Sequence, residues 1–131
     1  MAIFGGEREF RVGGLLCVLL ACLLLGCSRE QDAAGKIKTL GGRVKTDADK
    51  TVVEVSLDGT DADDGDMQFV AQFPKLRGLH LAGTLLTDEG IERLMGLSEL
   101  QALDVHNTAV SDAGIASLVK LSGLTKLGIG N

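Results

Sequence analysis

The sequence contains no tryptophan and no tyrosine, and only four of its 131 residues are phenylalanine. It therefore lacks most of the aromatic side chains on which nucleic-acid bases stack. Basic residues are also scarce, because 13 lysines and arginines stand against 18 acids, for a formal net charge of −5. Since nucleic-acid binding depends on basic surfaces, we expect no nucleic-acid partner. A chain of this length forms one small domain.

Charge is absent altogether from an apolar, leucine-rich run near the N-terminus. This run spans residues 12–25 and follows Arg8 and Arg11. It is too short for a comfortable transmembrane helix, which needs about 20 apolar residues. It has the length and flanking bases of a secretory signal, so residues 1–26 are expected to be a signal peptide. An uncleaved anchor helix is the alternative.

The apolar run ends in LLGC, whose cysteine is Cys27. This motif resembles the lipobox of bacterial lipoproteins, although Leu25 is a less usual residue at its position. The resemblance implies that Cys27 receives a diacylglycerol and becomes the new N-terminus, with residues 27–32 as the lipidated cysteine and its tether. Several acyl chains anchor a protein stably to a membrane. Ser28 is compatible with transfer to the outer membrane, so the expected location is the bacterial cell envelope, with the outer membrane favoured over the inner one.

Cysteine is too scarce in the mature chain for a disulfide framework. Cys17 and Cys22 lie within the signal segment and leave with it, so that Cys27 is the only cysteine retained. The mature chain therefore has no internal disulfide and no cysteine-ligated metal site.

The rest of the chain repeats itself every 24 residues. From Leu76 it reads LRGLHLAGTLLTDEGIERLMGLSE, from Leu100 LQALDVHNTAVSDAGIASLVKLSG, from Leu124 LTKLGIGN, and a weaker copy from Val52 reads VVEVSLDGTDADDGDMQFVAQFPK. Each copy opens with the apolar alternation of a short strand and continues with apolar residues three apart, as on one face of a helix. One such unit cannot bury its apolar face alone, so the units must stack.

Polar positions recur with the same period. Thr87 and Ser111 precede the predicted helices as N-caps do, and Asp63 takes that place in the first copy. An aspartate column follows the caps: Asp64, Asp88 and Asp112. A threonine column is expected to hydrogen-bond the turning backbone: Thr60, Thr84 and Thr108. A glycine column is expected to allow close helix packing: Gly90 and Gly114. Because Asp66 stands in the glycine column, the first copy is expected to be irregular.

The pattern LxxLxLxxTxxTDxGIxxLxxL resembles the leucine-rich repeat in its Thr-Asp-x-Gly bacterial form. The chain is similar to the small leucine-rich repeat lipoproteins of planctomycete-type bacteria. The resemblance covers residues 52–131, with three full repeats and one truncated repeat. It implies an α/β solenoid with parallel strands on a concave face and helices on a convex face, and it implies no chemistry.

Residues 33–51 are expected to cap the first repeat. A helix over 33–40 is predicted to point Ile37 and Leu40 inward and to stop at Gly41 and Gly42, and a strand is predicted over 43–46. The last predicted strand has no visible cap, and an unpaired strand edge is a liability.

Strand alternation predicts a row of polar side chains on the concave face. They are Glu54, Ser56, Asp58, His80, Asp104, His106 and Lys126. Three acids with one base at the margin favour a cationic or hydrogen-bond-donating partner. Small residues between them, including Gly78 and Gly128, are expected to let the backbone of a partner approach closely.

Three of these residues have the composition of a hydrolytic triad. Ser56, His80 and Asp104 fall in one row, because neighbouring strands lie about 4.8 Å apart. A triad also needs an oxyanion hole and a substrate cleft, and a flat, glycine-rich face supplies neither. A metal bound by Asp104 and the two histidines is a weaker alternative, and the aspartates of residues 58–66 lack the EF-hand spacing. We therefore expect no enzyme, no metal and no cofactor.

The sequence predicts a membrane-anchored, non-enzymatic binding or scaffold module with a protein or peptide partner on its concave face. The alternative is a structural repeat unit that assembles through its open C-terminal edge. The sequence names no partner and leaves the oligomeric state open.

Overall fold

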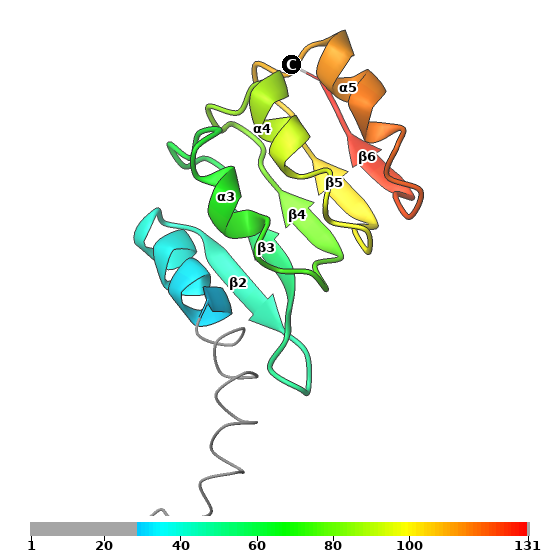
Figure 1. Ribbon diagram of the computed structural model, residues 1–131. Coiled ribbons are helices and arrows are strands. Elements are labelled where there is room, and N and C mark those ends of the chain that lie inside the picture. Colours follow the sequence, from blue (N-terminus) through cyan, green and yellow to red (C-terminus); the bar gives the residue numbers. More distant parts are fainter. Residues whose placement is uncertain (1–28, 131) are drawn as a thin grey trace, which may run out of the picture.

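The computed structural model describes residues 29–130, which form four helices and one five-stranded mixed sheet (Figure 1). The predicted α/β class is therefore confirmed, and the sheet is open, with β2 and β6 at its edges. The predicted signal peptide and Cys27 lie outside the described residues. Within the described part, no helix is long and apolar enough to cross a membrane.

The strands lie side by side in chain order, β2-β3-β4-β5-β6. The first pair, β2 (Arg43–Thr46) and β3 (Val52–Ser56), is antiparallel. The later strands all run parallel to β3; they are β4 (Gly78–His80), β5 (Ala102–Asp104) and β6 (Lys126–Gly128). Each parallel connection contains one helix; these are α3 (Met67–Val70), α4 (Asp88–Arg93) and α5 (Asp112–Leu118).

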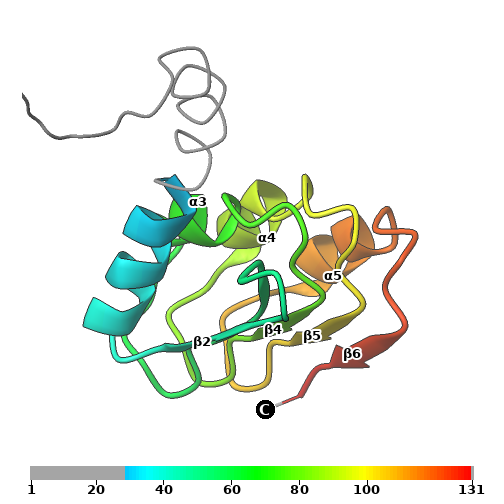
Figure 2. The same ribbon diagram turned by 90° about the horizontal axis from the view of Figure 1, so that it is seen from below.

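The three connecting helices cover one face of the sheet (Figure 2). The opposite face, which was predicted to be concave, carries no helix among the described residues, and we call it the open sheet face. A further helix over residues 29–39 precedes β2 and lies at the β2 end of the sheet (Figure 1).

The helix predicted before β2 is present. It ends where the two glycines were expected to stop it: Gly41 has a φ of 92°, and the Gly42 N–H donates to the Ile37 carbonyl at 2.9 Å, as in a Schellman motif. Ile37 is fully buried, as predicted. The helix is already formed at residue 29, however, so residues 29–32 of the predicted tether are helical.

The 24-residue period of the sequence sets the register of the parallel strands, because paired residues lie 24 positions apart. Val55 pairs with Leu79, Leu79 with Leu103, and Leu103 with Leu127. The first three are buried against the helices, with Leu79 0% and Leu103 2% exposed, whereas Leu127 at the last strand is 38% exposed. The core is therefore closed at the β2 end and less covered at the β6 end.

The predicted capping and threonine columns are both present. Thr87 accepts from the Glu89 N–H at 3.3 Å, and Ser111 accepts from the Ala113 N–H at 3.2 Å. Each threonine after a strand donates its hydroxyl to the carbonyl three residues earlier, at 2.7 Å; the pairs are Thr60 with Leu57, Thr84 with Leu81, and Thr108 with Val105. These threonines close the turns that lead from strand to helix.

The helix N-cap predicted for the first repeat, Asp63, is wrong. Helix α3 begins at Met67 and its N-cap is Asp66, which makes no side-chain capping bond. Asp63 instead accepts from the Asp66 N–H at 3.2 Å, and Asp66 accepts from the Asp63 N–H at 3.2 Å. Because this reciprocal pair holds residues 63–66 in a turn, the helix starts later than its counterparts in the other repeats. The predicted irregularity of this repeat is confirmed.

The aspartate column joins each repeat to the next. The Asp64 carboxylate accepts from the Thr87 N–H at 2.7 Å and from its hydroxyl at 2.5 Å. The Asp88 carboxylate accepts the same two bonds from Ser111 at the same distances. The helix N-termini of neighbouring repeats are thus tied together by carboxylates.

The glycine column makes room for these carboxylates. A Cβ atom at Gly90 would collide with Asp64 Oδ1 and Leu86 Cδ1, and one at Gly114 would collide with Asp88 Oδ1. Close helix packing was the predicted role of these glycines. The structure shows that the space they leave is taken largely by the aspartate of the preceding repeat.

Candidate functional site

The predicted site residues of the described chain gather on the open sheet face. Strand pairing aligns Ser56, His80 and Asp104 in one row, as predicted, and that row continues to Gly128. A second row holds Glu54 and, three strands further on, Lys126. Asp58 and His106 follow the ends of β3 and β5. The predicted lipidation site, Cys27, lies outside the described residues.

The three residues of the triad composition do not bind one another. Ser56 donates its hydroxyl to Asp58 Oδ2 at 3.2 Å. His80 Nε2 lies 3.6 Å from Glu54 Oε2. Asp104 bonds a different histidine. Because none of the three is joined to another, the row forms no proton relay of the hydrolytic kind.

Asp104 and His106 form a close pair beside β6. Asp104 Oδ1 contacts His106 Nδ1 and also accepts from the His106 N–H at 3.1 Å. Partial burial raises the pKa of Asp104, but the hydrogen bonds from the His106 ring and N–H outweigh it and hold the pKa below its ordinary value. The imidazole lies against β6, since a Cβ atom at Gly128 would be 2.8 Å from His106 Cε1.

The role predicted for the small residues of this face, close approach by the backbone of a partner, needs correction. A Cβ atom at Gly78 would lie 3.2 Å from Glu54 Cγ, and one at Gly128 would lie 2.8 Å from Asp104 Oδ1. Both glycines therefore accommodate a side chain from the neighbouring strand. They do not leave free space for the backbone of a partner, because side chains of this chain already occupy it.

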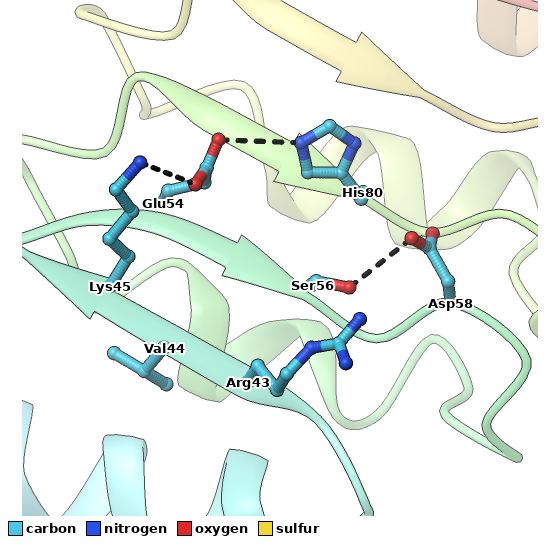
Figure 3. Close-up of a pocket in the computed structure, with 7 residues that line it drawn as sticks. All are labelled: Arg43, Val44, Lys45, Glu54, Ser56, Asp58 and His80. Atoms are coloured by element: carbon cyan, nitrogen blue, oxygen red, sulfur yellow. Dashed lines mark hydrogen bonds and ion pairs between the residues drawn. The ribbon is translucent and has the colours of Figure 1, made fainter.

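A hollow of about 440 Å³ lies over β2, β3 and β4 (Figure 3). Its lining is Arg43, Val44, Lys45, Glu54, Ser56, Asp58 and His80. Glu54 links two strands, with Lys45 Nζ at 3.5 Å from one carboxylate oxygen and His80 Nε2 at 3.6 Å from the other. Arg43 and Lys45 were missed as site residues, because residues 43–46 were assigned to a cap. The alternation of RVKT, with two bases on one face, was the signal that pointed to them.

A second hollow of about 280 Å³ adjoins the first at the start of the parallel strands. Its lining is Lys45, Val53, Glu54, Arg77, Gly78, Gln101, Ala102, Thr125 and Lys126. Lys45 and Glu54 belong to both hollows. The bases that line the two together are Arg43, Lys45, Arg77 and Lys126, whereas the acids are Glu54 and Asp58. Bases therefore outnumber acids in this part of the face, where the sequence predicted an acidic patch.

The metal alternative also depended on an arrangement that the fold does not make. Asp104 pairs with His106, whereas His80 pairs with Glu54 on the other side. In residues 29–130, no group of three or more histidine, cysteine, aspartate or glutamate side chains is placed to hold a metal ion.

Comparison of the chain with protein-family models and with curated proteins gave no match. The open sheet face is therefore the basis for a functional assignment.

Proposed function

We propose that the protein is a non-enzymatic binding or scaffold module whose open sheet face contacts a protein or peptide. The observation that carries this proposal is the shape and lining of that face. Two adjoining hollows lie on it, and residues from all five strands line them, with polar side chains from β2, β3, β4 and β6. The Glu54 carboxylate lies 3.5 Å from Lys45 Nζ on one neighbouring strand and 3.6 Å from His80 Nε2 on the other, so polar side chains of three strands meet there.

The repeat arrangement supports a second part of the proposal, that the chain is a short leucine-rich repeat protein. Each 24-residue unit contributes one parallel strand in register with the last. Each aspartate bond joins residues 23 apart, and the bonds recur with the 24-residue period. In a stacked array of this kind, every added repeat widens the same open face. That geometry favours binding to an extended partner.

The third part of the proposal concerns location. We propose that Cys27 is lipidated and holds the module on a membrane of the bacterial cell envelope, the outer membrane rather than the inner one. The support is the apolar run that ends in LLGC. The described helix begins at residue 29, so little chain separates the anchor from the domain.

Capture of the partner from chemically cross-linked cell envelope tests the binding face. The variant pair His80→Ala and Asp104→Ala is expected to lose the partner while keeping a similar melting midpoint. The matched pair Glu92→Ala and Arg93→Ala changes exposed residues of α4 and is expected to keep it. If the α4 pair abolishes capture and the face pair does not, the binding surface lies on the helix side.

The uncovered β6 end favours a second candidate, a structural unit that assembles with another copy through this edge. Within residues 29–130, no strand pairs with the outer edge of β6. A hollow of about 380 Å³ beside it has a mostly apolar lining, which includes Ile115, Leu118, Val119, Leu121, Leu124 and Leu127. Val119 is 81% and Ile129 51% exposed. Exposed strand edges and apolar patches of this kind promote association.

The mass of the protein in solution, from light scattering over a range of concentrations, separates the two candidates. Assembly through the edge predicts a dimer that Val119→Asp with Ile129→Asp dissociates. The control Leu85→Asp changes a leucine that is 60% exposed in another part of the surface. A monomer at every concentration excludes the structural candidate.

A further inference from the structure

The two carboxylates that line the hollows already have neighbouring partners within the protein. Glu54 lies 3.5 Å from the Lys45 ammonium and 3.6 Å from the His80 ring. Asp58 accepts from the Ser56 hydroxyl at 3.2 Å and from a backbone N–H of the turn after β4 at 2.9 Å. A cationic partner would have to displace these donors, and the displacement would offset much of the gain from the new contacts.

Three of the four bases around the hollows, all but Lys45, have no such partner among the described residues. Arg43, Arg77 and Lys126 are all exposed, and within residues 29–130 they form no ion pair. A guanidinium offers five donors in one plane, and two of them match the oxygens of a carboxylate. The unused hydrogen-bonding capacity of this surface is therefore cationic, although the whole chain has a formal charge of −5.

We propose that the two hollows form one groove that binds an acidic segment of a partner polypeptide. This basic groove is defined by its charged lining: Arg43, Lys45, Glu54, Asp58, Arg77 and Lys126. The inference rests on the proposed function and adds the chemistry of the partner. Arg43 receives one carboxylate in the larger hollow, and Arg77 with Lys126 receives others in the smaller hollow. One extended segment reaches both, because the hollows share Lys45 and Glu54.

The groove suits an acidic polypeptide better than other polyanions. The chain has no tryptophan or tyrosine, so it offers no such ring for a base to stack on. Glu54 and Asp58 also line the groove, and they repel a ligand that is charged along its whole length. A peptide avoids this repulsion, since it places acidic side chains at the bases and neutral ones elsewhere. An extended peptide advances about 3.3 Å per residue, so about eight residues cover the width of the five strands.

Binding of labelled peptides to the full chain in detergent micelles, measured by fluorescence anisotropy, tests the inference. The probe is a peptide of about eight residues with blocked ends and glutamate at alternate positions; two control peptides carry glutamine or lysine there. We expect the glutamate peptide to bind about tenfold more tightly than the glutamine peptide. A tenfold difference corresponds to one charge-assisted hydrogen bond that the glutamine peptide does not make. Its affinity is expected to fall with added salt. Tighter binding of the lysine peptide would overturn the inference.

Paired variants locate the binding. Arg43→Gln with Lys126→Gln removes two bases of the groove, and we expect about tenfold weaker binding. Arg93→Gln with Lys120→Gln removes two exposed bases outside it and changes the net charge equally, so we expect less than about a twofold effect. Equal losses in both pairs would mean general attraction rather than a groove. A single-stranded oligonucleotide or a polyuronate that binds more tightly than the glutamate peptide would overturn the polypeptide assignment.

These experiments distinguish a failure of the acidic-peptide proposal from a failure of the proposed function. If the glutamate peptide does not bind but the face pair His80→Ala and Asp104→Ala still loses the captured partner, the acidic chemistry is wrong and the binding face stands. If the α4 pair abolishes capture, the proposed function fails whatever the peptides do.

Discussion

Asp88 shows how much of this fold depends on single polar residues between repeats. The Ser111 hydroxyl and the Ser111 N–H donate to its carboxylate, and with a smaller contribution from the Gly114 N–H they hold the pKa of Asp88 below its ordinary value. A carboxyl whose pKa is lowered by folding stabilises the fold above its unfolded pKa, about 3.9, and loses that contribution as the pH falls through the folded pKa.

Asp88→Asn is therefore expected to lower the melting midpoint at pH 7, and the difference from the wild type is expected to shrink below about pH 4. Thermal melts across this range measure it. Asp112→Asn is the matched control, because Asp112 occupies the same position at the start of α5 and accepts no hydrogen bond among the described residues. An effect of Asp88→Asn that does not change with pH, or an equal effect of Asp112→Asn, would contradict this account.

The apolar column gives a second prediction at the same scale. Leu103 is 2% exposed, whereas Gln101 is exposed just before the same strand. Leu103→Ala is expected to lower the free energy of unfolding by about 2–5 kcal/mol, because it leaves a cavity. Gln101→Ala is expected to change it by no more than about 0.5 kcal/mol. Urea unfolding of both variants decides the point, and equal midpoints would mean that the two faces of the strand are wrongly assigned.

Among the elements, helix α4 packs closely against Leu86 and Asp64 because residue 90 is a glycine. Replacing a helical glycine by alanine usually stabilises a helix by about 1 kcal/mol. At Gly90 we expect the reverse, a loss of about 1–3 kcal/mol, because the new methyl group collides with Leu86 and Asp64. Gly96→Ala is the control, since nothing lies within 4 Å of its added Cβ. Chemical unfolding of the two variants measures the difference, and a stabilised Gly90→Ala protein would refute the proposed packing.

The elements also show what the sequence could predict. Strands β3 to β6 and the caps at Thr87 and Ser111 follow from patterns that repeat every 24 residues. The start of α3 does not, because Asp63 and Asp66 bond each other reciprocally in a turn that the other repeats lack. The charge of the open face was also predicted wrongly. It depends on which side of β2 faces the groove, and that follows from the pairing of β2 with β3, for which the period carries no information.

For the whole molecule, membrane attachment is the first prediction. We expect the mature chain to begin at Cys27, to carry acyl chains on that residue and to fractionate with membranes. Cys27→Ala is expected to block acylation and to shift the electrophoretic mobility. Intact-mass analysis and fractionation check both statements. A free thiol at Cys27, or a mature chain that still carries residues 1–26, would contradict the lipoprotein assignment.

Site-specific photo-crosslinking in the cells that make the protein tests the central claim, that the open sheet face is the binding surface. A photo-reactive amino acid is placed at position 80, on the open face, or at position 92, on the exposed side of α4. After irradiation, an immunoblot of the envelope detects adducts. The account predicts a higher-mass adduct from position 80 and none from position 92. An adduct from position 92 with none from position 80 would contradict it.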